Sequence, residues 1–215
     1  MRRLSRNASG LTKDEYAVLD ALRTPAAIQD FLDALPMNWE KDGPTYRSPR
    51  GVLAERKAHC IEGALLAATT LWIHGEPPVV MDLSAVEGKG DTDHVIALYR
   101  RAGHWGAVSK TNHAVLRFRD PVYRSPRELA LSYFNEWFLP TGEKTLECYG
   151  KPLHLTRFGT GWITAPDAQA IVDAVSIGVH YDLVPKGGWR HVRSADSMER
   201  KAASSLEWPR SDPRT

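Results

Sequence analysis

One stretch of the chain limits its possible folds more than any other: residues 60–73, with the sequence CIEGALLAATTLWI. Read as a helix, this stretch is apolar nearly all round, and Glu62 is its only charged residue. Such a helix must be buried at the centre of a domain. Gly75 follows at a position typical of a helix C-terminus, so we predict one central helix that begins at Cys60 and ends at Gly75.

Three short helices are predicted before the central one, over residues 13–23, 25–35 and 49–57. Each begins after a Ser or Thr that can accept a hydrogen bond from the first helical turn. In two of them Pro takes the first helical position, and in the other Glu15 completes a capping box. The third helix either ends near residue 57 or continues into the central helix. The capping residues are Thr12, Thr24 and Ser48.

After Gly75 the apolar residues recur with a period of 2 instead of 3.6, which indicates β-strands. Four strands are predicted, and short connections join the last three, so these three should form an antiparallel meander. A helix capped by Ser125 follows, and then a last strand and a short helix. The predicted strands are 79–83, 94–100, 104–110, 113–119 and 152–158, and the later helices are 125–138 and 165–175.

This order of elements predicts an α+β fold. The central helix should pack against an antiparallel sheet, with further helices at the N-terminus and after the sheet. A chain of 215 residues suits one domain, and we expect that domain to span residues 11–186, with its core in 48–122. Residues 1–10 are expected to be disordered, and the polar residues 187–215 to form a loosely ordered tail.

The charge balance argues against a nucleic-acid-binding protein. Basic residues exceed acidic ones by two, and this excess lies within residues 190–215, so the rest of the chain is neutral. A local exception is the segment 100–127, where six arginines and one lysine stand against Asp120 alone. This segment forms either solvated strand faces and loops or a basic rim that attracts an anionic substrate.

The cysteine content and the apolar runs of the sequence indicate the cellular compartment of the protein. Two cysteines cannot build a disulfide framework, which favours a reducing compartment. No apolar run follows the basic residues 1–10, so we predict no secretory signal. No run of about 18 apolar residues occurs, so no membrane partner is expected. A cytoplasmic protein is the expectation from these features.

Cys60 lies where the start of a helix would make a thiol reactive. The backbone N–H groups of a first helical turn are unpaired and carry partial positive charge, which lowers the pKa of a thiol placed there. Lys57 and His59 add positive character nearby. The same N–H groups can stabilise the oxyanion that forms when a thiolate attacks a carbonyl. A free cysteine is often only a packing residue, and we expect that role for Cys148.

A nucleophilic cysteine needs a base, and His94 is the candidate. It is the first residue of a predicted strand and shares a face with Ile96 and Leu98. We expect that face to point toward the core and toward the Cys60 helix. The competing interpretation is a hydrogen-bonded core histidine without a catalytic role.

A third group should orient the imidazole of His94 from a neighbouring strand. Ser109 and Asn112 are the polar candidates on the next strand and its turn, and the amide oxygen of Asn112 can accept a ring N–H. Asp120 lies one strand further and shares parity with an apolar set, so it is expected to face inward, where a carboxylate needs a partner such as His94. Asp93 is too close along the strand to face the same way.

The order Cys, His and then Asn or Asp resembles the transglutaminase-like branch of the papain-like superfamily. Two stretches carry the resemblance: AHCIEGALLAATTLWIHGEPPVVMDL, residues 58–83, and DTDHVIALYRRAGHWGAVS, residues 91–109. In that family the cysteine begins a central helix, and the histidine and the acid lie on successive antiparallel strands. The whole resemblance covers residues 50–122.

The resemblance implies a papain/transglutaminase-like fold in which Cys60 is the nucleophile and His94 the base. The family's aspartate stands at the position where this chain has Ser109. Asn112 or Asp120 would then supply the third group, or the triad would be incomplete.

The leading functional interpretation is cysteine-dependent acyl transfer on an amide or peptide bond, without a cofactor. Water as the acceptor gives a protease or amidase, and an amine gives a transglutaminase-type enzyme. The substrate would be a peptide, a protein or an amide-containing small molecule. The alternative is a catalytically inactive domain of this family that binds a peptide or protein partner in the same cleft. The candidate substrate-binding residues are Trp105, Ser109 and Arg117, and Tyr46, Tyr123, Arg119 and Arg124 are further candidates for the cleft.

A metal site is the third class considered. The chain offers enough ligand types for zinc, but no tight pair such as CxxC or HExxH occurs, and we expect no bound metal. The residues in question are His59, Cys60, Asp93, His94, His104 and His113.

Overall fold

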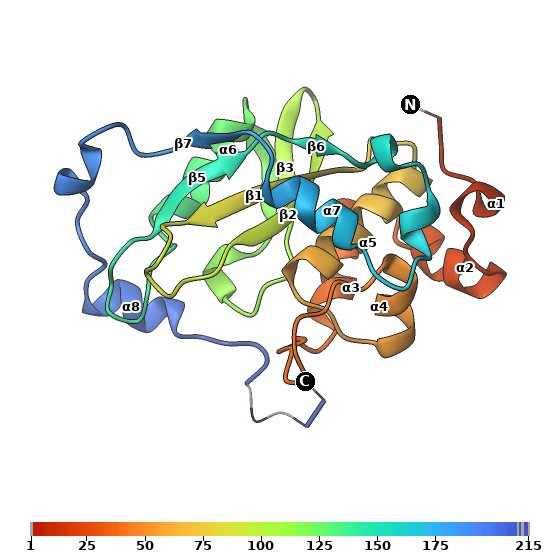
Figure 1. The fold of residues 1–215 in the computed structure, drawn as a ribbon, viewed down its shortest axis with the longest axis horizontal. Helices are drawn as coiled ribbons and strands as arrows, with labels where there is room; N and C mark the ends of the chain where they lie inside the picture. The colour runs from red at the N-terminus through yellow and green to blue at the C-terminus, as the bar shows by residue number, and fades with distance from the viewer. Residues whose placement is uncertain (1, 210, 212, 215) are drawn as a thin grey trace.

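One antiparallel sheet forms the core of the fold. The structure, a computed structural model, describes residues 2–209, 211, 213 and 214. Within them the strand order is β4–β3–β2–β1–β5–β7, and β6 also pairs with β1 (Figure 1). All of these pairs are antiparallel. The strands are β1 (Val79–Ala85), β2 (His94–Arg101), β3 (His104–Val108), β4 (Arg119–Tyr123), β5 (Leu146–Gly150), β6 (Leu153–His154) and β7 (His180–Asp182).

The helices before the sheet begin where the capping residues predict. Thr12, Thr24 and Ser48 each accept a hydrogen bond from the backbone N–H three residues further on. Arg56 adopts a left-handed conformation with φ of 56°, which ends α4 and separates it from α5. The helices are α1 (Arg6–Ser9), α2 (Lys13–Ala21), α3 (Pro25–Asp33), α4 (Pro49–Glu55), α5 (Cys60–Ile73), α6 (Pro126–Phe134), α7 (Gln169–Ser176) and α8 (Ser197–Ala203).

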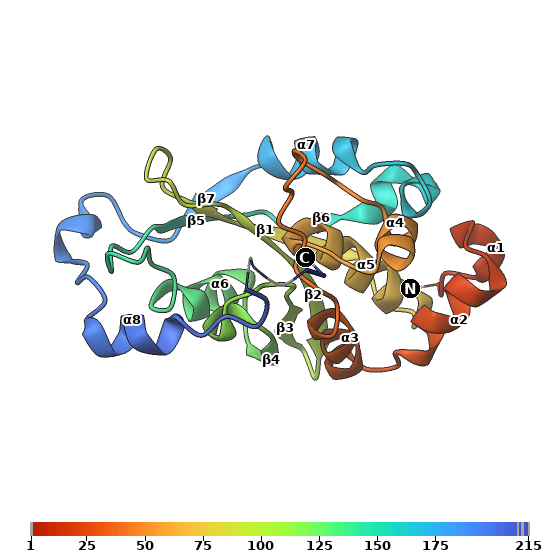
Figure 2. The same cartoon turned by 90° about the horizontal axis from the view of Figure 1, so that it is seen from below.

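Different helices cover the two faces of the sheet. Helix α5, together with α2, α3, α4 and α7, packs on the face that carries Val80, Val95 and Val108. Helix α6 packs on the other face, which carries Ile96 and Leu98. Figure 2 shows α6 and α7 on opposite sides of β1 and β5. The predicted α+β class, with a helix starting at the cysteine packed on an antiparallel sheet, is confirmed.

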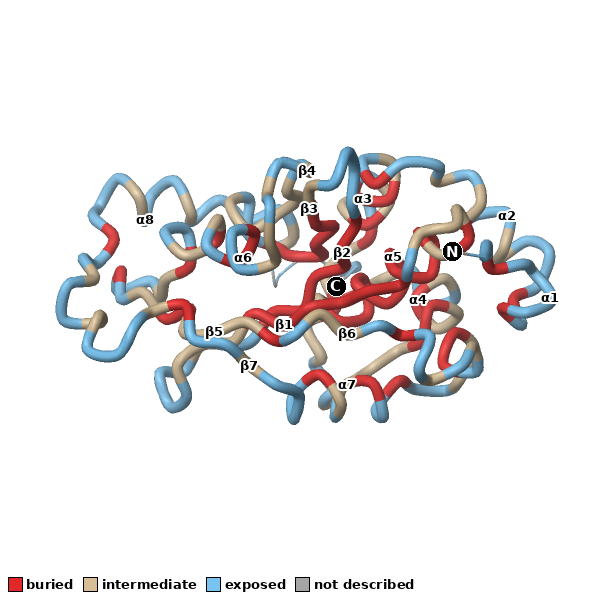
Figure 3. The backbone as a smooth tube through the Cα atoms, turned by 90° about the horizontal axis from the view of Figure 1, so that it is seen from above, coloured by how far each residue is buried: buried red, intermediate tan, exposed pale blue. Residues whose placement is uncertain are grey.

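Helix α5 is the central helix that residues 60–73 predict. Nearly all of its residues are buried, and buried chain runs as a band through α5, β1 and β2 (Figure 3). The buried hydroxyls of Thr69 and Thr70 donate to backbone carbonyls one turn earlier, so they remain satisfied. Gly75 has a φ of 89°, the left-handed conformation that favours glycine after a helix. No helix in the described part of the chain is long and apolar enough to span a membrane.

The predicted strand over 113–119 is wrong. Residues 114–116 form a 3₁₀ turn, and β4 begins only at Arg119. The chain leaves the sheet after β3 because Lys110 turns inward, where its ammonium donates to the carbonyls of Leu32 and Leu35 at the end of α3. Strands β5 and β7 were not predicted, and only Leu153–His154 of the expected last strand forms β6.

Helix α6 is shorter than the predicted range of 125–138. It ends at Phe134 because the chain must turn to bury Trp137 in the core under the sheet. The indole N–H of Trp137 donates to the carboxylate of Asp91, at 3.0 Å. The helical pattern of the sequence continues past the point where this tertiary contact ends the helix.

The two ends of the chain are more ordered than expected. Residues 6–9 form α1, and Leu4 is buried with its backbone N–H bonded to the carbonyl of Trp72. The C-terminal region contains α8, after which the chain returns to contact residues 112–117. The expectations for Met1, Arg210, Asp212 and Thr215 concern residues that lie outside the described ones.

Candidate active site

Cys60 is the first residue of α5 and is half-buried. Two backbone hydrogen bonds hold the segment in front of it: Ala58 donates to Pro36, and Asn38 donates to Ala58. The thiol therefore lies at a fixed helix start, where unpaired N–H groups and the helix dipole favour a negative charge.

His94 is the first residue of β2 and is buried, and it lies close enough to the Cys60 thiol to lower the pKa of that thiol. Our expectation about its strand face was wrong. Ile96 and Leu98 pack against α6, whereas α5 packs on the face that carries Val95. His94 nevertheless lies near the thiol, because it is the first residue of β2 and this end of the sheet lies next to the start of α5.

Ser109 holds the other side of the His94 ring. The Oγ of Ser109 lies 2.7 Å from Nε2 of His94. The single hydroxyl proton is donated to the carbonyl of Leu116, at 3.0 Å, so Oγ must accept the Nε2–H of His94. Because Nε2 is occupied in this way, Nδ1 is the nitrogen left for the Cys60 thiol. Ser109 thus takes the orienting position, and it does so as a neutral acceptor.

Ser109 is itself fixed from α3 and α5. The side-chain amide of Gln29 on α3 bonds both the backbone N–H and the carbonyl of Ser109, each at 2.9 Å. On the other side, a Cβ added to Gly63 would lie 2.4 Å from the Cβ of Lys110. The absence of a side chain at Gly63, one turn after Cys60, lets residues 109–110 approach the start of α5.

The other two candidates for the third group lie elsewhere. The amide of Asn112 is used by the backbone of Trp208, whose carbonyl accepts from Nδ2 and whose N–H donates to Oδ1. Asp120 is exposed on β4, so the expectation that it faces inward toward His94 is wrong. The register of β4 explains the error: the strand starts six residues later than predicted, which changes the neighbours of Asp120.

His59 is a second histidine beside the thiol. Its Nε2 lies 2.7 Å from the backbone carbonyl of Thr45, and because a carbonyl only accepts, this nitrogen carries a proton. Its Nδ1 lies 3.9 Å from Sγ of Cys60. His59 is buried, and the edge of its ring faces Tyr46, with 6.5 Å between the ring centroids.

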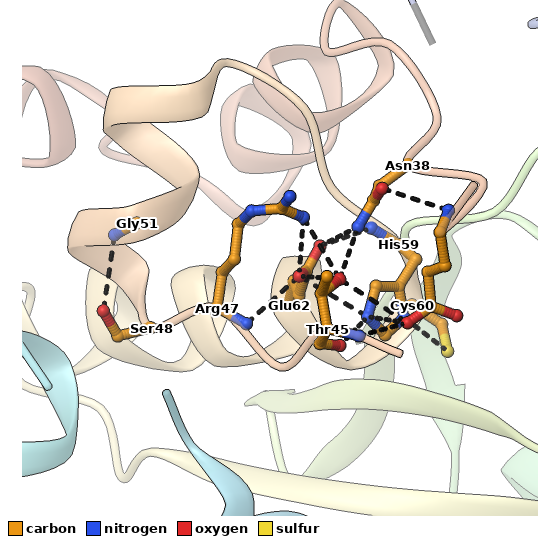
Figure 4. A network of polar contacts seen from close by, with 9 residues as sticks. Asn38, Thr45, Arg47, Ser48, Gly51, His59, Cys60 and Glu62 are labelled. Carbon is orange, nitrogen blue, oxygen red and sulfur yellow. Dashed lines mark hydrogen bonds and ion pairs between the residues drawn. The ribbon is translucent and has the colours of Figure 1, made fainter. Parts of the chain in front are cut away.

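A buried carboxylate organises the loop that holds His59 (Figure 4). Glu62, on the first turn of α5, is fully buried and accepts five hydrogen bonds. One comes from the backbone N–H of His59, and the others come from the loop before α4, including an ion pair with Arg47 at 3.0 Å. The donors are Asn38 Nδ2, Thr45 Oγ1, Arg47 N, Arg47 Nη1 and His59 N.

These contacts shift the titration of the thiol and of His59 in opposite directions. Burial alone would raise the pKa of Cys60, but hydrogen bonds and positive charge from His59 and His94 outweigh it and lower the pKa to about 5. Burial alone would lower the pKa of His59, but its contacts with Cys60, Glu62 and Thr45 outweigh this and raise the pKa to about 9. A thiolate beside an imidazolium is therefore the favoured state between about pH 5 and pH 9.

Of the three predicted substrate-binding residues, Ser109 lies at this site as the partner of His94, whereas Trp105 and Arg117 make contacts elsewhere. Trp105 pairs with Arg100 across β2 and β3, and its ring lies under that guanidinium. This is the far end of β2 from His94, about 20 Å away at the usual rise per residue. Arg117 pairs with Asp33 and Glu207.

Most of the expected basic rim is likewise used within the fold. Lys110 is fully buried, which lowers its pKa to about 8 despite nearby acidic groups. Arg101 pairs with Glu76, and Arg119 pairs with Glu136 and stacks over Tyr133. These cations do not form a continuous surface for an anion.

Cys148 contrasts with Cys60. It lies on β5 opposite Ser84 of β1, and burial raises the pKa of its thiol. Among the residues that the structure describes, no three His, Cys, Asp or Glu side chains are grouped as metal ligands would be. The metal-site alternative therefore has no geometric basis in that part of the chain.

Comparison with known proteins adds no family. A scan against protein-family models finds no match for this chain, and a search of curated proteins finds none either.

Sequence reasoning missed three residues of this site. Gln29 lies 80 residues before Ser109, and nothing in its local pattern marks it as a clamp for a distant strand. Glu62 offered a signal, since it is the one charge on an otherwise apolar helix and a buried charge needs partners. His59 was considered as a nearby positive group and as a candidate metal ligand, but not as a partner of the thiol, because its orientation depends on the loop carbonyl of Thr45.

Proposed function

We propose that this chain is a cysteine-dependent acyl-transfer enzyme of the transglutaminase-like kind, acting on an amide or peptide bond. One observation carries the proposal: His94 lies beside the Cys60 thiol at a helix start and helps to lower its pKa, while Ser109 holds Nε2 of His94 at 2.7 Å. Nucleophile, base and orienting group thus form one connected chain. The order of these groups along the sequence also resembles that family, with serine in place of its aspartate.

The proposed reaction begins with the thiolate. The Cys60 sulfur forms a bond to the carbonyl carbon, and the C=O π electrons move onto oxygen, where N–H groups at the start of α5 stabilise the charge. As the C–N bond breaks, protonated His94 donates its Nδ1 proton to the leaving amine. Neutral His94 then takes a proton from water or from an acceptor amine, which attacks the thioester and restores the thiolate.

A carboxylate is not required at the third position for this role. Ser109 accepts the Nε2–H of His94 and so keeps Nδ1 directed at the sulfur. It supplies no negative charge, so the imidazolium that forms during the reaction is stabilised less than beside an aspartate. We therefore expect a slower acyl transfer than a complete Cys-His-Asp triad would give.

The test follows acylation of Cys60 by an activated ester, read by mass spectrometry, in a protein carrying Cys148→Ala. If the proposal is right, the ester acylates Cys60, and water or an added primary amine then removes the acyl group. His94→Ala should lose this turnover. Cys60→Ala should form no adduct. Should Cys60 acylate no faster than a free thiol, or should His94→Ala turn over unchanged, the enzyme proposal fails and a peptide-binding domain becomes the better account.

A further inference from the structure

The mechanism above leaves one buried group at the sulfur without a role. The His59 ring contacts Cys60 Sγ from the side of the loop before α4, whereas His94 approaches from β2. Two histidines from separate elements therefore share one sulfur. A helix needs no histidine before its first residue, and Ser, Thr, Asp or Asn would cap the start of α5 better.

The position of His59 is built from several directions. Its Nε2–H donates to the carbonyl of Thr45 at 2.7 Å, and its backbone N–H donates to Glu62 at 3.0 Å. The imidazole Nε2 also lies 3.5 Å from Glu62 Oε1 and 3.6 Å from Glu40 Oε1. With Nε2 fixed on a carbonyl, the ring cannot turn, and Nδ1 stays directed at Cys60 (Figure 4).

The charges around the ring favour an imidazolium. Glu40 and Glu62 face it from the loop and from α5, and the Cys60 sulfur faces it from the helix start. Arg47 is the opposing cation, but its guanidinium is bonded to Glu62 and neutralises part of that charge. His94 is a second positive group at the sulfur when protonated, but the charges in contact with the His59 ring itself are the two carboxylates and the thiolate.

We propose that His59 is the resident partner of the Cys60 thiolate, which leaves His94 free to carry protons during catalysis. This assignment rests on the proposed function for its catalytic meaning, but the pairing itself can be measured without a substrate. The two histidines would divide the work: His59 keeps the sulfur ionised at rest, and His94 serves the leaving group and the acceptor.

The first arm of the test measures iodoacetamide alkylation of Cys60 against pH in the Cys148→Ala background. His59→Asn removes the charge but keeps a side chain that caps helices well. Loss of a cation in contact with the sulfur should raise the alkylation midpoint by about 1 to 3 pH units. At pH 5, where the parent thiol is half ionised, the rate should then fall at least about 5-fold. His104→Gln, at the start of β3 and opposite Arg101 at the far end of β2 from His94, is the matched control and should leave the midpoint unchanged.

A second arm keeps the proposal falsifiable if His59→Asn folds poorly. The ring proton signals of His59 are followed by NMR in the Cys148→Ala protein and in the same protein with Cys60→Ser. Because linkage is reciprocal, loss of the thiolate should lower the midpoint of His59 from about 9. An unchanged midpoint for His59 in this arm, or for Cys60 in the first, would overturn the pairing.

The two proposals fail separately. If the ester is not turned over but His59→Asn still raises the alkylation midpoint, the enzyme proposal fails and the pairing stands. If the ester is turned over in a way that depends on His94, but the alkylation midpoint of Cys60 is the same in His59→Asn as in the parent protein, the enzyme proposal stands. His59 is then only part of the loop structure.

Discussion

Ser109 shows how one residue can take the place of another with different chemistry. Aspartate orients a histidine through charge, whereas Ser109 orients His94 through the direction of a hydroxyl proton that is already committed to Leu116. Gln29 then fixes the backbone of Ser109 from α3. The orientation of the imidazole thus depends on neutral hydrogen bonds, and its effect on rate should be modest.

Replacing Ser109 with alanine tests this point. The change removes one hydrogen bond to His94, worth about 1 kcal/mol, so acylation of Cys60 should slow by roughly 3- to 10-fold. The alkylation midpoint should move little, because His59 still faces the sulfur. Acylation rates with the activated ester measure the first effect and iodoacetamide profiles the second.

Ser132 provides the matched control for that variant. Like Ser109, it donates to a carbonyl, that of Leu129, and accepts from a side-chain N–H, that of Arg119. It lies on α6, so Ser132→Ala should lose comparable stability without slowing acylation. Equal acylation rates in Ser109→Ala and the parent protein would show that Ser109 does not orient His94.

At the level of elements, the sequence predicts best what is local. Capping residues placed the starts of α2, α3, α4 and α6, and the apolar run of residues 60–73 placed α5 at the centre, because these signals lie within one or two turns. The pair of Cys60 and His94 could be proposed in the same way, since each opens an element with a clear pattern. Their closeness in space was not predictable, because it depends on how β2 packs against the start of α5.

What the sequence could not predict depends on contacts between distant segments. Apolar and polar residues alternate after β3 as they do in a strand. Lys110 nevertheless bonds to the end of α3, so the chain leaves the sheet there and β4 starts later. That shift removed Asp120 from the site and left Ser109 as the orienting group. The sequence offered Ser109 only as one of several polar candidates, and its contacts with Gln29, Leu116 and His94 became visible only in the structure.

Gly63 connects α5 to the strand that carries the orienting group. In most helices, Gly→Ala adds stability through helix propensity, up to about 1 kcal/mol. Here the new Cβ would meet Lys110 Cβ at 2.4 Å, and Lys110 cannot withdraw because its ammonium is fixed at α3. Gly63→Ala should therefore lower the free energy of unfolding by about 1 to 3 kcal/mol, as overpacking does.

Urea unfolding measures that change, and Gly161→Ala is its control. Nothing lies within 4 Å of a Cβ added at Gly161, so its unfolding midpoint should stay close to that of the parent protein. Acylation of Cys60 should also slow in Gly63→Ala, because the strain falls next to Ser109. A stable Gly63→Ala protein with normal acylation would mean that residues 109–110 can move away from α5 without cost.

At the scale of the whole molecule, the C-terminal region closes the fold onto the loop behind the site. Glu207 pairs with Arg117 at 2.5 Å, and the backbone of Trp208 bonds the side-chain amide of Asn112. The indole N–H of Trp208 donates to the carbonyl of Asp33 at the end of α3. The segment thus joins α3 to the loop that follows Ser109, although it lies nearly a hundred residues further along the chain.

Deleting residues 204–215 should therefore lower the free energy of unfolding but leave the titration of Cys60 almost unchanged. The half-exposed ion pair contributes at most about 1 kcal/mol, and each of the three lost hydrogen bonds of Trp208 about 0.5–1.5 kcal/mol, so the free energy of unfolding should fall by about 1.5 to 5.5 kcal/mol. The alkylation midpoint of Cys60 should hardly change, because the hydrogen bonds that hold His59 come from Thr45 and Glu62, neither of which is deleted.

Asn112→Ala tests whether the deletion lowers stability through the Asn112–Trp208 hydrogen bonds or through an unspecific effect of truncation. Its amide bonds only the Trp208 backbone among the side-chain contacts that the structure describes. If those bonds hold the segment in place, the deletion should cost less in the Asn112→Ala background than in the parent protein, and a double-mutant cycle of urea unfolding measures the difference. Strictly additive costs would mean that Asn112 and the C-terminal segment stabilise the fold independently. The cycle therefore decides whether the end of the chain supports the loop behind Ser109 or only covers it.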